Sequence, residues 1–160
     1  MPVPLYDVLL VAHLVTAVVG FGAIGVAGLS AWSGRRSASP VGEERLLRYF
    51  REGPDVAGRL IFLVPVLGLA MLFGGDRHEI SSLWPWAGLA AFLVAAGLAT
   101  AIAWPAERRA QKALAAAVSG GGNAERVDDF RAACLKMERA IAGIEVCFVV
   151  ALGVMIAQPR

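Results

Sequence analysis

Four long apolar stretches make up most of this 160-residue chain. They run over residues 8–32, 60–75, 80–106 and 140–158. A helix rises about 1.5 Å per residue, so about 20 apolar residues cross a bilayer core about 30 Å thick. Backbone N–H and C=O groups in lipid must be paired within their own segment, which favours a helix for each stretch. The chain is therefore predicted to be an all-α polytopic membrane protein, a bundle of four transmembrane helices.

The composition favours one membrane domain over residues 1–160. Hydrophobic residues make up 58% of the chain and charged residues only 18%, against about a quarter in a soluble domain. No Lys or Arg precedes the first stretch, which is also longer than a secretory signal core, so we expect a retained first helix. The expected transmembrane helices are at about 6–32, 56–75, 82–105 and 138–158, with cytoplasmic loops at 33–55 and 106–137.

Lys and Arg concentrate in two of the three connections between these helices. The first contains or borders Arg35, Arg36, Arg45, Arg48, Arg51 and Arg59, and the third contains Arg108, Arg109, Lys112, Arg126, Arg131, Lys136 and Arg139. The positive-inside rule then predicts both basic loops in the cytoplasm and both termini outside it. The basic loops lack the interleaved aromatic residues of a nucleic-acid binder, so lipid and no nucleic acid is expected as partner.

The third connection has the pattern of a helical hairpin. Its first half has high helix propensity, Gly120–Gly122 interrupts it, and Asn123 is a candidate cap for the following helix. Apolar residues then recur at alternating steps of three and four, as in a seam between paired helices. The seam residues are Val127, Phe130, Cys134, Met137, Ile141, Ile144, Phe148, Ala151 and Met155. The hairpin could dock a soluble partner or simply clamp the bundle.

Other patterns predict local packing. Pro65 predicts a kink in the second helix, and residues 41–51 form an amphipathic basic segment expected on the inner membrane surface. Small residues let membrane helices approach closely. They recur as Ala87, Ala91, Ala95, Ala99 and Ala103 in the third helix and as Gly20, Gly22, Gly25 and Gly28 in the first. These rows predict packing within the chain, and a homodimer through them is an alternative.

Two ionisable residues within the spans are candidates for function, because charge in lipid is costly. Glu145 lies in the fourth helix above its inner end, and the long side chain of Arg59 can reach upward from the inner end of the second. We expect a structural ion pair between them, with a proton or ion relay as the alternative.

His13 is the second candidate. Met71 and Met155 are expected at about its depth, and His78 lies in the adjacent outer loop. Imidazole and thioether groups suit Cu(I) or haem iron, which predicts a cofactor or metal site at these residues. The alternative is a buried histidine bonded to a backbone carbonyl or to Thr16, with the methionines as packing residues.

Several of these features together resemble a known bacterial group. They are His13 early in the first helix, a glycine-rich segment ending at Trp32, a short second span with Pro65 and Gly68, and the Trp104-Pro105 exit followed by Arg108-Arg109. The chain resembles uncharacterised predicted integral-membrane proteins of four helices, which are similar to the copper-resistance D membrane domain. It is more remotely similar to the membrane protoporphyrinogen oxidase, which binds haem b. That oxidase also uses a lysine in a later span, and the third helix here has none.

The residues thus point to a membrane protein without an identifiable catalytic group. No phosphate loop, HExxH motif or nucleophile–base arrangement is present. The leading hypothesis is a redox-accessory protein that holds haem b or copper at His13. The alternatives are a structural or assembly subunit of a membrane complex acting through the hairpin, or a transporter of small solutes.

Overall fold

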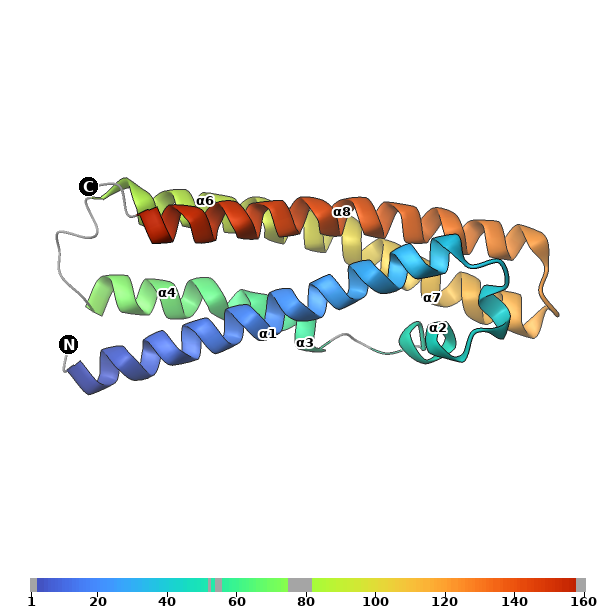
Figure 1. Cartoon of the computed structure of the whole chain (residues 1–160), viewed down its shortest axis with the longest axis horizontal. Helices are drawn as coiled ribbons and strands as arrows, with labels where there is room; N and C mark the ends of the chain where they lie inside the picture. Colours follow the sequence, from blue (N-terminus) through green and yellow to red (C-terminus); the bar gives the residue numbers. More distant parts are fainter. Residues whose placement is uncertain (1–2, 52, 54–55, 75–81, 158–160) are drawn as a thin grey trace. The chain divides into compact units, whose positions relative to one another are not determined.

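The structure, a computed structural model, describes residues 3–51, 53, 56–74 and 82–157. Every regular element in these residues is helical, as the sequence predicted (Figure 1). The α-helices are α1 (Val3–Arg36), α2 (Glu44–Tyr49), α3 (Val56–Arg59), α4 (Leu63–Gly74), α6 (Leu83–Leu98), α7 (Trp104–Ser119) and α8 (Ala124–Ala157). Short 3₁₀ turns η1 (Pro40–Gly42) and η2 (Leu60–Phe62) and a π-helical turn η3 (Ala99–Ala103) join some of them.

Four of the helical segments are long enough and apolar enough to cross a membrane. They are Leu5–Arg36, Ala57–Gly74, Leu83–Ser119 and Ala124–Ala157. Most of the surface of these segments is exposed and apolar, as lipid-facing helices require. The predicted all-α fold, with four helices long and apolar enough to span a membrane, is therefore confirmed.

The chain forms two compact units. Unit 1 contains the described parts of residues 1–24, 55–96 and 145–160, and unit 2 contains those of residues 25–54 and 97–144. Helices α1 and α8 are each continuous over 34 residues and contribute to both units.

In unit 1, close approach of α1 to the second span depends on Gly20. A Cβ atom built on Gly20 would lie 2.9 Å from the backbone nitrogen of Ile61, which is itself fully buried. The next residue of α1, Phe21, stacks on Phe148 of α8 with ring centroids 4.2 Å apart. Gly20 thus serves helix packing, as the glycine row predicted.

The second span is interrupted where Pro65 predicts a kink. Proline removes the hydrogen bond to the carbonyl four residues earlier and clashes with it, and that carbonyl belongs to Ile61. The chain forms the 3₁₀ turn η2 at this level, and α4 begins at Leu63. Pro65 therefore lies in the first turn of a new helix.

In unit 2, the predicted seam of α8 is its buried face. Phe130, Cys134, Met137, Ile141 and Ile144 are all buried. Two glycines of α1 admit these side chains, because a Cβ on Gly28 would lie 2.8 Å from Ile141 Cγ2 and one on Gly34 would lie 2.9 Å from Phe130 Cζ. The seam hypothesis is thus confirmed for this half of α8.

The turn between α7 and α8 also follows the predicted pattern. Helix α7 ends at Ser119, and Gly121 and Gly122 adopt φ values of +67° and +86°, which glycine tolerates best. Asn123 Oδ1 then accepts a hydrogen bond of 3.0 Å from the backbone N–H of Glu125. Glycine break and asparagine cap are both confirmed.

The first basic loop differs from the prediction. Residues 41–51 were expected to place their apolar side chains in the inner membrane surface. Instead, Leu46 and Phe50 are buried in unit 2, and Phe50 meets Phe130 edge-on with ring centroids 5.1 Å apart. The hydroxyl of Tyr49 donates to Glu107 on α7. The apolar side of this segment is used for packing on protein, so it is not available to lipid.

Candidate functional site

Unit 1 contains a half-open cavity of about 340 Å³, called here the unit 1 cavity. Side chains of α1, α4, α6 and α8 all contribute to its walls, which are mainly apolar. The side chains able to form hydrogen bonds or bind a metal are Tyr6, His13, Met71, Trp84 and Met155. A cavity of this size lies within the range of small-molecule sites, about 300–1,000 Å³. Three of the four predicted cofactor residues thus line one cavity.

His13 is fixed in this wall by a hydrogen bond between helices. Its Nδ1 atom lies 2.9 Å from the carbonyl oxygen of Val64 on α4, and the residue is half-buried. A carbonyl oxygen only accepts, so Nδ1 carries the proton in this bond. In the neutral imidazole, Nε2 then carries the lone pair and is the atom available to a ligand. The carbonyl partner was one of the sequence alternatives for His13.

Gly68 makes this hydrogen bond possible. It lies four residues after Val64 on α4, and the two share one helix face. A Cβ on Gly68 would lie 3.2 Å from His13 Cε1 and 3.6 Å from His13 Nδ1. The imidazole therefore occupies space that a larger side chain at residue 68 would restrict.

Met155 likewise lies close to a glycine, Gly88 of α6. A Cβ on Gly88 would lie 3.2 Å from Met155 Cε, and both residues line the unit 1 cavity. Met71 lines the cavity from α4. Thr16 does not contact His13 by hydrogen bonding, because its hydroxyl donates to Ala12 O within α1 at 2.7 Å.

One predicted member of the site is not described by the structure. His78 lies outside the described residues. Among residues 3–51, 53, 56–74 and 82–157, no three His, Cys, Asp or Glu side chains cluster as a metal site would require. A metal in the unit 1 cavity would therefore depend on thioether sulfur in addition to His13.

The structure does not contain the predicted ion pair between Glu145 and Arg59. Arg59 is exposed, whereas Glu145 Oε1 is buried and has no hydrogen-bond partner in the described part of the chain. Ion pairs do form elsewhere, as between Arg35 and Glu138 in unit 2, where the guanidinium Nε lies 2.7 Å from the carboxylate. The pair was predicted because residue counting places Glu145 and Arg59 at similar depth in the membrane, but the two side chains form no ion pair.

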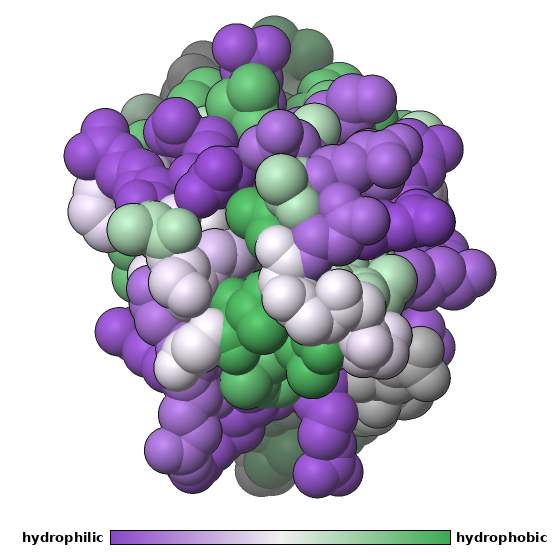
Figure 2. Space-filling view, turned by 90° about the vertical axis from the view of Figure 1, so that its right-hand side faces the viewer, coloured by the Kyte–Doolittle hydropathy of each residue, from purple (hydrophilic) through white to green (hydrophobic). Residues whose placement is uncertain are grey.

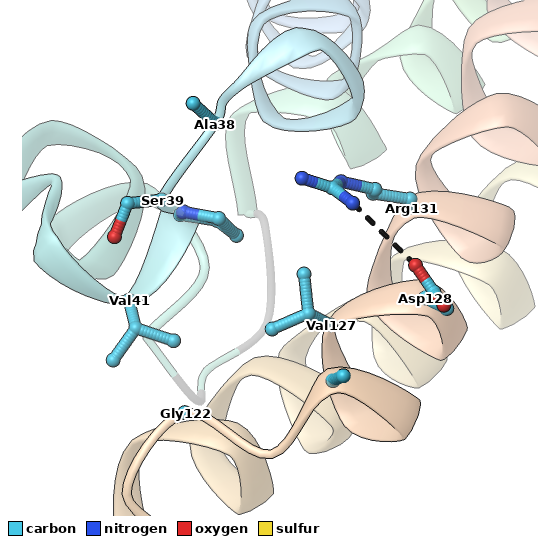
Figure 3. Close-up of a pocket in the computed structure, with 9 residues that line it drawn as sticks. Ala38, Ser39, Val41, Gly122, Val127, Asp128 and Arg131 are labelled. Carbon is cyan, nitrogen blue, oxygen red and sulfur yellow. Dashed lines mark hydrogen bonds and ion pairs between the residues drawn. The ribbon is translucent and has the colours of Figure 1, made fainter.

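Unit 2 has a smaller hollow of about 280 Å³, called here the unit 2 hollow. Figure 3 shows Val41 and Val127 facing it from opposite sides and Arg131 at its edge, bonded to Asp128. Arg131 also donates to the carbonyl oxygen of Ser37 at 2.9 Å. In Figure 2, hydrophilic side chains surround a smaller apolar area on this end of unit 2. The hollow lacks the imidazole and thioether groups of the unit 1 cavity.

The fold and the cavity define an α-helical protein with four helices able to cross a membrane and a ligand-sized space among them. Comparison with protein-family models, curated proteins and solved structures gives no match. Its function must therefore be argued from its own residues.

Sequence reasoning missed the residues that shape the cavity wall around His13. The carbonyl of Val64 carries no sequence signal, since every residue has one. Gly68 was noted only as part of a resemblance and Gly88 was not singled out. The position of Gly68, one turn after Val64, indicates a contact with His13 only once it is known that α4 faces α1.

Proposed function

We propose that this protein is a membrane-embedded binding protein that holds haem b or copper in the unit 1 cavity, with Nε2 of His13 as the ligating atom. One observation carries the proposal. The bond from His13 Nδ1 to Val64 O directs the proton to Nδ1, in a cavity that Met71 and Met155 also line. Ligating histidines in proteins usually donate their other ring N–H to a carbonyl or carboxylate in this way.

The donor set fits both groups. Cu(I) prefers soft ligands, and one imidazole with two thioethers supplies them. Haem iron accepts an imidazole and a thioether, and the mainly apolar walls suit the porphyrin. Haem or copper would supply an iron or copper centre able to accept and release one electron. The chain's own residues would bind that group, orient it and limit its contact with water.

The proposal includes a location. The orientation proposed, with both termini outside the cytoplasm and the basic connections inside, follows from the distribution of Lys and Arg. The bacterial inner membrane is what the resemblance to the bacterial four-helix group implies. His13 would then lie nearer the outer surface. No catalytic residue is proposed, and the role suggested is that of an accessory redox protein.

Purified protein in detergent tests the proposal. Wild type should show a haem absorption band, or bind copper at about one atom per chain by elemental analysis after titration with Cu(I). The His13→Ala variant should lose the bound group, while Thr16→Ala, one turn along the same helix, should keep it. Wild-type protein that takes up neither haem nor copper after reconstitution would refute the proposal.

A second candidate function is that of an assembly subunit of a membrane complex, acting through the α7–α8 hairpin. The unit 2 hollow favours it, because Val41 and Val127 give it an apolar wall beside the bonded pair Asp128 and Arg131, which suits a partner segment that presents an apolar side chain next to a polar one. Co-purification in mild detergent should recover such a partner from wild type and not from a Val127→Asp variant. Equal recovery from both would contradict this function.

A further inference from the structure

Two candidate ligand side chains that line the unit 1 cavity both lie against glycine. His13 lies on Gly68 of α4, and Met155 lies on Gly88 of α6. In each case the Cβ of a larger residue would come within 3.2 Å of a ligand side chain. Carbon atoms settle at about 3.5–4.0 Å, so either substitution would push the side chain by a few tenths of an ångström.

The other glycines of the same unit show that this is a local feature. Gly22 on α1 and Gly153 on α8 have no atom within 4 Å of a Cβ position. Gly20 abuts Ile61 and so serves helix packing. Among these described glycines of unit 1, only Gly68 and Gly88 meet side chains that could bind a metal.

From these contacts we infer that Gly68 and Gly88 are positioning residues that hold His13 and Met155 as the ligand pair for one bound metal atom. The inference rests on the proposed function and deepens it, because it selects Met155 over Met71 as the sulfur ligand and adds two residues to the site. Gly68 acts through the hydrogen bond. Val64 O and Gly68 lie one turn apart on the same face of α4. A Cβ at residue 68 would push the imidazole away from α4, which would also lengthen the 2.9 Å hydrogen bond from Nδ1 to Val64 O.

Gly88 acts on a more flexible group. Its contact is the terminal methyl of Met155, which can rotate away, whereas the imidazole of His13 is held at its Nδ1 atom. The effect of a methyl group at residue 88 should therefore be smaller than at residue 68. Gly88→Ala should change the position of the Met155 sulfur and leave the tautomer of His13 unchanged.

The first test measures the imidazole without any bound group. The chain has two histidines, so a His78→Asn background leaves His13 as the only one. ¹⁵N NMR of histidine-labelled protein in micelles should show the Nδ1–H tautomer in this background. Gly68→Ala should add a population of the Nε2–H tautomer, while Gly22→Ala and Gly88→Ala should not. An unchanged tautomer in Gly68→Ala would overturn the inference.

The second test measures binding of haem and of Cu(I) to the same variants. Loss of the groups that orient a ligand typically weakens metal affinity by roughly 10- to 100-fold, which is the loss expected for Gly68→Ala. Gly88→Ala and Met155→Leu should weaken binding less and change the spectral signature of sulfur ligation. Gly153→Ala and Gly22→Ala should behave as wild type, and Met71→Leu should change binding and spectrum less than Met155→Leu.

The outcomes separate the two proposals. A wild type that binds neither group refutes the proposed function, and with it the metal-ligand role of Met155, even if the tautomer experiment supports the contact at Gly68. A wild type that binds normally in all glycine variants overturns the inference and leaves the proposed function standing. A signature lost in Met71→Leu and kept in Met155→Leu overturns the choice of Met155.

Discussion

The contact between Gly20 and Ile61 yields a quantitative prediction for packing in unit 1. The change is Gly20→Ala, with Gly22→Ala as the matched control on the same helix. A Cβ at residue 20 would lie 2.9 Å from both the backbone nitrogen and Cγ2 of Ile61. Non-bonded atoms settle at about 3.5–4.0 Å, so a shift of roughly 0.6–1.1 Å is required. One of these two atoms belongs to the backbone, so rotation of the Ile61 side chain alone cannot supply that shift.

The magnitude follows from the two opposing effects. Overpacking a well-packed site costs about 1–3 kcal/mol. Alanine in place of a helical glycine gains about 0.5–1 kcal/mol, and at Gly22 nothing opposes this gain. The two variants should therefore differ in free energy of unfolding by about 1–3 kcal/mol, with Gly22→Ala the more stable.

Reversible unfolding in mixed micelles measures this difference. Protein in a mild detergent is titrated with sodium dodecyl sulfate, and helicity is followed by circular dichroism. Equal stability of the two variants, or a more stable Gly20→Ala, would refute the claim that α1 meets the backbone at Ile61. Gly20→Ser gives an independent check, since it adds similar bulk at the same position.

Two further predictions use the same assay. Phe130 is fully buried against Phe50 and Gly34, so Phe130→Ala should destabilise the protein by about 3–5 kcal/mol, while Lys136→Ala on the exposed side should change stability by less than about 0.5 kcal/mol. A Phe130→Ala variant as stable as wild type would contradict the packing of unit 2. The second concerns Glu145, whose buried Oε1 has no partner in the described part of the chain, so Glu145→Leu should stabilise the protein by about 1–3 kcal/mol. Destabilisation by Glu145→Leu would show that a donor reaches this carboxyl group in the membrane.

Much of the secondary structure could be predicted from the sequence because its signals are local. Length and hydropathy define the four spans, glycines 120–122 end α7, and Asn123 caps α8. The apolar seam of α8 needed only the helical repeat, since a side chain's face is set by its position along one helix. The effect of Pro65 followed from its missing N–H, although the break came one turn earlier, at η2.

The candidate site was predictable only in part. His13, Met71 and Met155 were placed at similar depth by counting residues, and they do line one cavity. Counting also placed Glu145 within reach of Arg59, yet no ion pair forms between them, because depth does not determine how each helix is rotated. Similarly, the composition of residues 41–51 suits either lipid or protein, and the buried ring of Phe130 decides for protein.

The sequence by itself determined that this chain is helical, which four stretches are apolar enough to span a membrane, and which face of α8 is apolar. Only the tertiary structure decided which residues meet. Val64 O accepts a hydrogen bond from His13, 51 residues away in the sequence, and Gly68 and Gly88 lie against the two candidate ligands. The physical reason is range. Helix formation and hydrophobic period depend on neighbours within a few turns. Contacts between helices depend on their rotation and separation, which are set by small-residue packing along their whole length.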